Sequence, residues 1–274
     1  MRVSAILVPF FAVLSGVGGY YLRLSELLNV FDPLTGLPDR NAATTFWLIV
    51  LSAFNLLLIV VFAIFVAARN RSPRGFESAF GTDPVFYPVV FSLSGIVWLI
   101  GTYLYFAYHR AADTLQTMEI YFIILSAVAA ICVTVFAIEM FQDSRRKAQY
   151  TLSIVPTIFL CFWLLLIYRL NASNPILISY LYQCLAIVAS ALGFYFTSGF
   201  LYDKPAPGKA IVSYYASIYF CAVTLADSHH LGLKLILGAI IAISIVHMAM
   251  LLRHLRRKWP GEIDPGEVDI DKQA

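Results

Sequence analysis

Between Thr45 and Ala68 the chain reads TFWLIVLSAFNLLLIVVFAIFVAA, without a single charged side chain. The hydrocarbon core of a bilayer is about 30 Å thick, and a helix of about 20 apolar residues crosses it. This stretch therefore predicts a transmembrane helix. Seven further stretches have the same character, and they cover approximately residues 3–22, 86–108, 118–141, 150–170, 176–200, 211–226 and 233–255.

The composition agrees with a chain that is mostly surrounded by lipid. Of its 274 residues, 60% are hydrophobic and 13% are charged, whereas soluble domains carry about 25% charged residues. We therefore expect an all-α, polytopic integral membrane protein with eight transmembrane helices and the lipid bilayer as its main partner. Residues 1–258 should form one transmembrane domain. Residues 259–274, which contain few apolar side chains, should form a disordered cytoplasmic tail.

Arg and Lys are distributed unequally between the connections that join the predicted spans. If the first span starts inside, the inner connections and the two ends hold fourteen of the 19 basic residues. The outer connections hold the other five, which are Arg23, Arg40, Arg110, Arg169 and Lys234. Basic residues are retained on the cytoplasmic side, so we expect both termini in the cytoplasm. The net charge of +3 is then a topological signal and does not predict a nucleic-acid partner.

The outer connection between the first two predicted spans contains FDPLTGLP, from Phe31 to Pro38. Together with the short first helix and the series of apolar helices that follow, this segment resembles a group of multi-spanning membrane proteins from gut Clostridia. The resemblance covers mainly residues 1–45, and the group has no assigned activity. It implies the plasma membrane of a Gram-positive bacterium, and it carries no functional residue over to this chain.

Several polar side chains gather near the predicted outer ends of the spans. An ionisable side chain costs about 2.5–3.5 kcal/mol at the bilayer centre on insertion scales, so such residues suggest functional sites. We expect an outward-facing polar pocket that binds a small solute. Its candidate residues are Glu119, Arg169, Tyr182, Gln183 and Asp227. The charges would supply electrostatic complementarity, and the Tyr and Gln side chains would select the solute by hydrogen bonding.

Two other interpretations of this outer region stay open. In a structural interpretation, Glu119 pairs with Arg169 or Arg110, and the remaining polar residues are solvated. In a metal interpretation, His229 and His230 bind an ion together with a nearby carboxylate. Adjacent residues of a helix point about 100° apart, so these two imidazoles are poorly placed to ligate one ion. We therefore expect neither a metal nor another cofactor.

Small and polar residues form stripes along two neighbouring predicted spans. The predicted span 211–226, extended by two residues to Ser228, carries Ser213, Ser217, Cys221, Thr224 and Ser228 at helical spacing. Residues 176–200 carry Ala186, Ala189, Ser190, Gly193 and Thr197 in the same manner. Small residues let helices approach closely and hydroxyls bond across the interface, so we expect these two helices to pack together. A water-filled pathway lined by hydroxyls is the alternative.

His247 lies deeper than the other histidines, on the inner half of the last predicted span. It predicts either a neutral imidazole that is hydrogen-bonded to a neighbouring helix or a group that handles protons. Glu139, Arg253 and His254 lie close to the inner ends of their spans, where we expect them to anchor the helices at the membrane surface. All four cysteines fall inside predicted spans, so no disulfide framework is expected.

Three classes of function remain after this reading of the residues. The sequence contains no phosphate-binding loop, zinc-protease motif or nucleophile elbow, so soluble catalysis is not expected. The first class is a small-solute transporter or a substrate-binding membrane component that uses the outer pocket. The second is a non-catalytic membrane partner or sensor that docks a protein or anionic lipid through its Arg-rich cytoplasmic loops. The third is an intramembrane enzyme that modifies a lipid.

Overall fold

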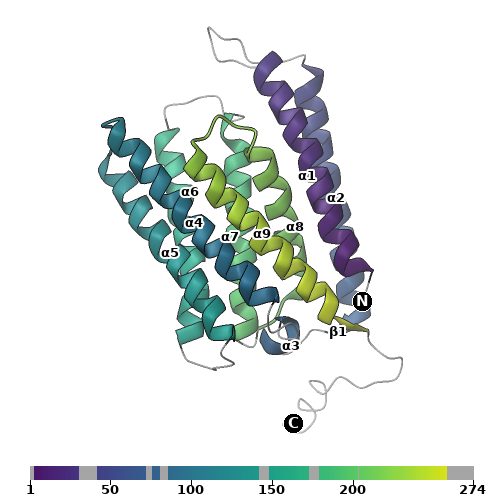
Figure 1. The fold of residues 1–274 in the computed structure, drawn as a ribbon. Helices are drawn as coiled ribbons and strands as arrows, with labels where there is room; N and C mark the ends of the chain where they lie inside the picture. The colour runs from purple at the N-terminus through teal and green to yellow at the C-terminus, as the bar shows by residue number, and fades with distance from the viewer. Residues whose placement is uncertain are drawn as a thin grey trace, which may run out of the picture.

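The structure, a computed structural model, describes residues 3–30, 42–71, 76–80, 86–141, 148–172, 179–202 and 204–257. Its long helices are α1 (Ser4–Asn29), α2 (Ala43–Arg69), α4 (Phe86–Ala111), α5 (Thr117–Phe141), α6 (Ala148–Leu170), α7 (Leu181–Leu201), α8 (Pro207–Thr224) and α9 (Leu231–His254) (Figure 1). A short helix, α3 (Phe76–Phe80), and two two-residue strands, β1 (Asn70–Arg71) and β2 (Arg256–Arg257), complete the described elements. The predicted all-α class is confirmed, and each predicted span overlaps one long helix.

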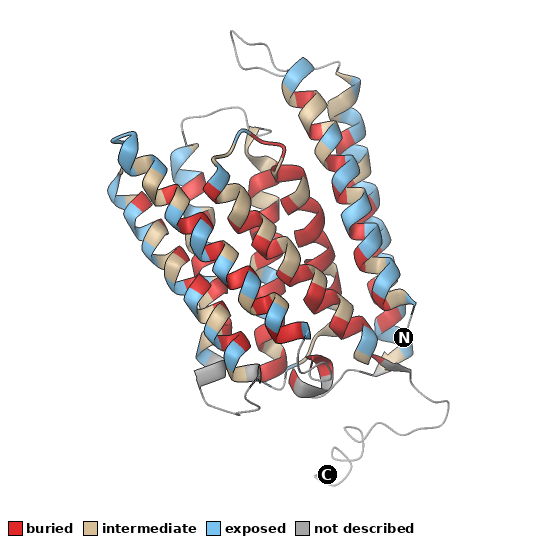
Figure 2. Ribbon diagram, viewed as in Figure 1, coloured by how far each residue is buried: buried red, intermediate tan, exposed pale blue. Residues whose placement is uncertain are grey.

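Seven of the described helices are long and apolar enough to cross a membrane, and α8 is not among them. The reason lies in where α8 packs. Thirteen of its 18 residues are buried inside the protein, and Figure 2 shows this helix as almost continuously buried. Its neighbours are side chains of the same protein rather than lipid, so α8 carries Ser and Tyr residues that a lipid-facing helix would avoid. The chain is a multi-pass membrane protein by its seven apolar helices.

The helices form a closed ring with a hairpin attached to one side. Helices α4 to α9 each pack against the next helix in the chain, and α9 packs back against α4. The hairpin of α1 and α2 lies outside this ring and packs against α8, with α1 also touching α9 (Figure 1). Helix α8 is therefore enclosed between the ring and the hairpin, which explains its burial.

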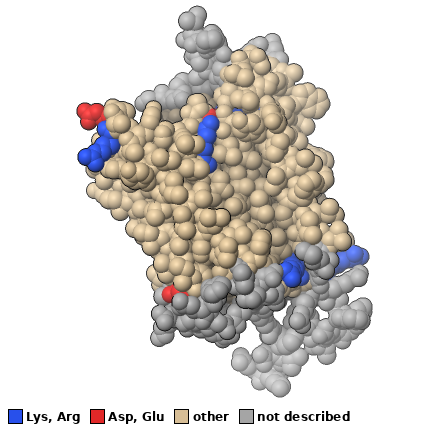
Figure 3. Space-filling model, in the orientation of Figure 1, with Lys and Arg blue, Asp and Glu red and all other residues tan. Residues whose placement is uncertain are grey.

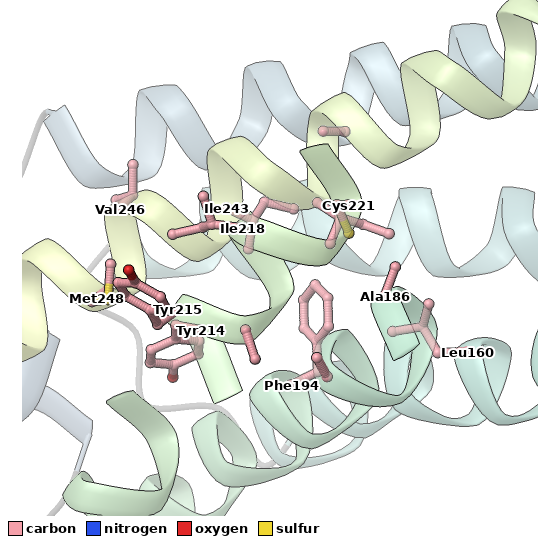
Figure 4. Close-up of a cluster of buried hydrophobic side chains, with 14 of the residues drawn as sticks. Leu160, Ala186, Phe194, Tyr214, Tyr215, Ile218, Cys221, Ile243, Val246 and Met248 are labelled. Atoms are coloured by element: carbon pink, nitrogen blue, oxygen red, sulfur yellow. The ribbon is translucent and has the colours of Figure 1, made fainter. Parts of the chain in front are cut away.

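The interior of the ring is filled by apolar and aromatic side chains from four helices. Figure 4 shows this cluster, whose labelled members are Leu160, Ala186, Phe194, Tyr214, Tyr215, Ile218, Cys221, Ile243, Val246 and Met248. Lipid tails are as apolar as these side chains, so tight packing rather than escape from water stabilises such an interface. The predicted close packing of the two stripes is confirmed, because Ser190 on α7 and Ser217 on α8 hydrogen-bond at 2.8 Å. Ser217 also meets Ser244 of α9 at 3.1 Å.

The beginning of α1 and the end of α9 lie at the same end of the molecule (Figure 1). There β1, which follows α2, pairs with β2, which follows α9, in an antiparallel register of Asn70 with Arg257. On the face drawn in Figure 3, the charged side chains lie near the two ends, and a broad uncharged band separates them. This distribution agrees with a bundle that spans a bilayer. The segment Phe31–Pro38 and the tail 259–274 lie outside the described residues.

One boundary differs from the prediction in a way that matters for the site. The sequence predicts that the first span ends near Leu22. In the structure α1 continues without a break to Asn29. The additional two turns keep Arg23 and Glu26 on the helix, and both side chains are buried. They form the centre of the candidate site.

Candidate functional site

A buried cluster of charged side chains lies at the end of the molecule where α1 ends and α2 begins. Arg23 on α1 donates from Nε to Oδ1 of Asp227 at 2.8 Å, and from Nη1 to Oε2 of Glu26 at 2.7 Å. Its Nη2 donates to the carbonyl oxygen of Ser179 at 3.2 Å, just before α7. Only 1% of the Arg23 side chain and none of the Glu26 side chain is exposed. We call Arg23, Glu26 and Asp227 the outer charge cluster, because they lie at the end of the molecule that the distribution of basic residues predicts to face outside.

Two further residues, Thr45 and Tyr182, contact this cluster. Thr45 Oγ1, at the start of α2, donates to the second carboxylate oxygen of Glu26 at 2.7 Å. The guanidinium of Arg23 lies 5.2 Å from the ring centre of Tyr182, close enough for a cation–π contact. The cluster thus connects α1, α2, the start of α7 and the segment between α8 and α9. Residues far apart in the sequence are held together by one arginine.

The formal charges of the outer charge cluster do not cancel. One guanidinium faces two carboxylates, which leaves one negative charge in excess while His229 is neutral. Oδ2 of Asp227 has no hydrogen-bond partner among the described residues, and neither has Nε2 of the partly buried His229. These two atoms lie 3.8 Å apart. An unsatisfied buried polar atom is costly, so this pair marks a place where a small ligand would be favourable.

Burial dominates the titration behaviour of these two groups, which lie between α8 and α9. Loss of solvation raises the pKa of Asp227 above its usual value, although the nearby Arg23 opposes the shift. Burial lowers the pKa of His229, although the neighbouring Asp227 opposes the shift. The two pKa values are therefore displaced toward each other.

A line of hydrogen-bonded groups continues from the cluster along the interface between the hairpin and α8. Ser52 of α2 and Tyr219 of α8 meet through their hydroxyls at 2.9 Å. About one turn further along α8, the Tyr215 hydroxyl donates to Oδ1 of Asn55 at 2.7 Å. Ser15 of α1 lies 3.4 Å from that same hydroxyl. We call these five residues the polar seam.

The structure separates the residues that the sequence grouped into one pocket. Asp227 belongs to the outer charge cluster, Tyr182 contacts Arg23 of that cluster, and Gln183 is buried on α7. Glu119 lies on α5, which packs against α4 and α6, whereas α1 packs against α2, α8 and α9. Arg169 is exposed at the end of α6. Two of the five candidates, Tyr182 and Asp227, therefore lie at the cluster, and Glu119 and Arg169 do not.

Glu119 has a local role at the start of α5. Its Oε2 accepts a hydrogen bond from the backbone N–H of Gln116 at 3.1 Å, the arrangement of a helix capping box. The same oxygen lies 3.6 Å from Nδ1 of His109. The expected pairing of Glu119 with Arg169 or Arg110 is not found in the described part of the chain, where both arginines are exposed. The side chain of Glu119 therefore bonds to the backbone at the start of its own helix.

Comparison of the chain with protein-family models, with curated proteins and with solved structures finds no match. Any function must therefore be argued from the geometry of the chain itself. Among the residues that the structure describes, no three His, Cys, Asp or Glu side chains stand close enough together to hold a metal ion. His230 instead stacks on Tyr108 with ring centres 4.2 Å apart and accepts a hydrogen bond from the Gly232 backbone.

His247 lies in a cage of aromatic rings at the other end of the ring of helices. Its ring centre is 5.0 Å from that of Phe91 and 5.3 Å from that of Tyr214. The expected hydrogen bond to a neighbouring helix is not made by Nε2, which has no partner among the described residues. His247 borders a small cavity that offers about 10 Å³ to the centre of a water molecule, the lower limit for holding one.

Sequence reasoning missed the two residues at the centre of the site, Arg23 and Glu26. Arg23 was counted only as an outer basic residue. A signal was nevertheless present, because Gly16, Gly19, Arg23 and Glu26 recur at helical spacing. Extension of the first helix by two turns would have placed both charges on the face that carries these glycines.

Proposed function

We propose that this chain is a small-solute transporter, or the substrate-binding component of one, in the plasma membrane. All eight long helices, α8 included, would cross the bilayer with both termini in the cytoplasm. Helix α8 rises about 27 Å over its 18 residues, close to the thickness of the hydrocarbon core. The outer charge cluster and Tyr182 would form the solute site on the outer side.

The observation that carries the proposal is the burial of two carboxylates and one guanidinium inside an apolar membrane bundle. Ionisable side chains are rare at such places, and by default they mark pathways or binding sites. The cluster also lies where three separate segments meet, namely the hairpin, the start of α7 and the α8–α9 connection. Binding sites of membrane bundles are commonly built between such segments.

The polar seam supplies a route from this site toward the opposite end of the bundle. The polar seam lies between the α1–α2 hairpin and the ring. Movement of the hairpin would therefore expose hydroxyl and amide groups without unfolding either part. Alternating access of transporters commonly rests on such rigid-body movement of one bundle against another. The excess carboxylate predicts the class of solute, which should carry a positive charge or several hydrogen-bond donors.

A second function is favoured by one specific observation. Nε, Nη1 and Nη2 of Arg23 all donate to protein acceptors. An arginine whose three nitrogen atoms all bond to protein acceptors is typical of a structural clamp, which here would fix the hairpin to the ring. The protein would then be a non-catalytic membrane partner or sensor, whose basic cytoplasmic segments dock a protein or anionic lipid.

The two functions differ in whether a small molecule stabilises the purified protein. We would measure thermal unfolding in detergent with panels of primary amines, amino acids, sugars and nucleosides. The transporter proposal predicts that an amine-bearing compound raises the unfolding midpoint of the wild type and of Asp113→Asn, an exposed carboxylate at the same end. The effect should be lost in Glu26→Gln.

Two outcomes would overturn the proposal. One is that no compound class stabilises the wild type, and that the only effect of Glu26→Gln is to lower the stability of the protein. The other is that a compound stabilises the wild type and Glu26→Gln equally, which would place its site elsewhere. The first outcome would favour the structural clamp.

A further inference from the structure

We propose that the outer charge cluster has a second ligand, a proton held between Oδ2 of Asp227 and Nε2 of His229. This inference rests on the proposed function, because it concerns the same cluster and names the ion that would compete with the solute. The proton would come from bulk water and bind to the imidazole nitrogen. The new N–H would then donate to the free carboxylate oxygen of Asp227.

The charge balance of the cluster favours the bound proton, and it opposes the loss of solvation that lowers the pKa of His229. Arg23 neutralises one of the two carboxylates, and the second carries the excess negative charge into a region of low dielectric constant. Protonation of His229 brings the sum of the four formal charges to zero. A neutral, hydrogen-bonded cluster is far less costly to bury than one with a net charge.

The geometry is close to what a shared proton requires. Arg23 engages Oδ1 of Asp227, so that Oδ2 is left for His229. The 3.8 Å between Oδ2 and Nε2 is about 1 Å longer than a charge-assisted hydrogen bond. Rotation of the imidazole closes that gap, while the backbone N–H of His229 stays bonded to the carbonyl oxygen of Asp227 at 2.7 Å.

Charged groups reach this pair from several packed elements. Arg23 and Glu26 face Asp227 from α1, and Lys234 of α9 acts on His229 together with Arg23. The two cations oppose protonation of the imidazole, whereas Glu26 and Asp227 favour a bound positive charge. Burial raises the pKa of Asp227 and lowers the pKa of His229, so the two groups differ less in proton affinity than they would in water.

A proton and a cationic solute would neutralise the same excess carboxylate. They cannot both be favoured at once, so each should weaken the binding of the other. Such competition couples the outward movement of one to the inward movement of the other, as in a proton–solute exchanger. Reciprocity of binding free energies makes the effect measurable from either side.

The proton site is tested by histidine NMR of the full chain in detergent, without any solute. The signal of His229 is assigned by its loss in His229→Gln. We expect its titration midpoint to fall by about one pH unit in Asp227→Asn, because the carboxylate that favours the imidazolium is gone. A midpoint that does not move would overturn the inference.

A second measurement covers the case in which Asp227→Asn does not fold. The variant His229→Gln leaves Asp227 in place, so the difference between its infrared carboxyl titration and that of the wild type reports the coupling of Asp227 to His229. We expect the carboxyl signal of Asp227 to titrate at different pH in the wild type and in His229→Gln, and identical titration would overturn the inference. Solute binding with an unmoved His229 midpoint contradicts only this inference. A coupled pair without solute binding contradicts only the proposed function.

Discussion

Arg23 shows how a single side chain decides the local architecture. It is 204 positions away from Asp227 in the sequence, yet the two side chains are joined at 2.8 Å. Removal of one partner of a buried ion pair costs far more than the pair contributes, because the remaining charges stay in a medium that cannot solvate them. The effect of a substitution in the outer charge cluster on stability should therefore depend on the net charge that remains buried.

Arg23→Met should lower the free energy of unfolding by about 3–5 kcal/mol, because it leaves two carboxylates buried without a cation. Thermal unfolding in detergent would measure the loss. Arg169→Met is the matched control, since that arginine is exposed and should contribute about 0.5 kcal/mol or less. Addition of Glu26→Gln and Asp227→Asn to Arg23→Met should restore much of the stability. Equal stability of Arg23→Met and Arg169→Met would contradict burial of the cluster.

His229 predicts a dependence of stability on pH. Its pKa is lower in the folded protein than its ordinary value of 6.5, so the unfolded chain binds the proton more readily. The contribution of a neutral His229 to stability is therefore complete above about pH 6.5, and it is lost as the pH falls toward the pKa of His229 in the folded protein. Thermal unfolding between about pH 7.5 and about pH 5.5 should show a smaller loss in His229→Gln than in the wild type. Identical profiles would show that His229 does not titrate in this range.

Helix packing explains why the site survives in an apolar bundle. Helix α1 approaches α8 closely at its glycines, and the hairpin is held there by side-chain hydrogen bonds of the polar seam. Helix α8 tolerates polar residues because the ring covers one of its faces and the hairpin covers the other. The element therefore depends on its neighbours more than any other helix does.

Gly16→Ala should destabilise the contact between α1 and α8 by about 1–3 kcal/mol. A Cβ atom at this position would lie 2.8 Å from Cβ of Ala222, which is too short to be relieved by rotation of a side chain. Gly18→Ala is the control, because the nearest atom to its Cβ is 4.0 Å away, on Leu51. Thermal unfolding of the two variants would compare them. A loss as large in Gly18→Ala would mean that helix propensity, and not packing, causes the effect.

At the scale of the whole molecule, the basic residues and the direction of the helices together predict the orientation in the membrane. The end of α2 and the end of α9 meet through β1 and β2. The outer charge cluster lies at the opposite end, where α1 ends. The proposed solute site faces the outside only if the basic end is cytoplasmic.

Labelling of single introduced cysteines tests this orientation. Asp113, between α4 and α5, and Lys204, before α8, are both exposed and lie at opposite ends of the bundle. Asp113→Cys should react with a membrane-impermeant maleimide in intact cells. Lys204→Cys should react only after permeabilisation. The reverse pattern would place the outer charge cluster in the cytoplasm and would contradict an outward-facing site.

The sequence by itself determined the all-α class and the approximate position of each long helix. This succeeds because the solvent of a transmembrane segment is lipid, so about 20 consecutive residues carry the signal without reference to the rest of the chain. The helix predicted at residues 211–226 is present as α8, but α8 is not among the seven helices that are apolar enough to cross a membrane, because its polar residues face protein. The same local rule predicted an end of α1 that lies too early. Hydropathy counts Arg23 and Glu26 as unfavourable in lipid, whereas in the structure Arg23 bonds to both Glu26 and Asp227.

Only the tertiary structure decided which polar residues belong together. Tyr182 and Asp227 could be named from their depth, but depth alone also selected Glu119 and Arg169, which lie on other sides of the bundle. Two side chains at equal depth meet only if their helices are neighbours and their faces point toward each other. That depends on the packing of α1 against α8 and α9, which is a contact between the two ends of the chain and leaves no signal within any one span.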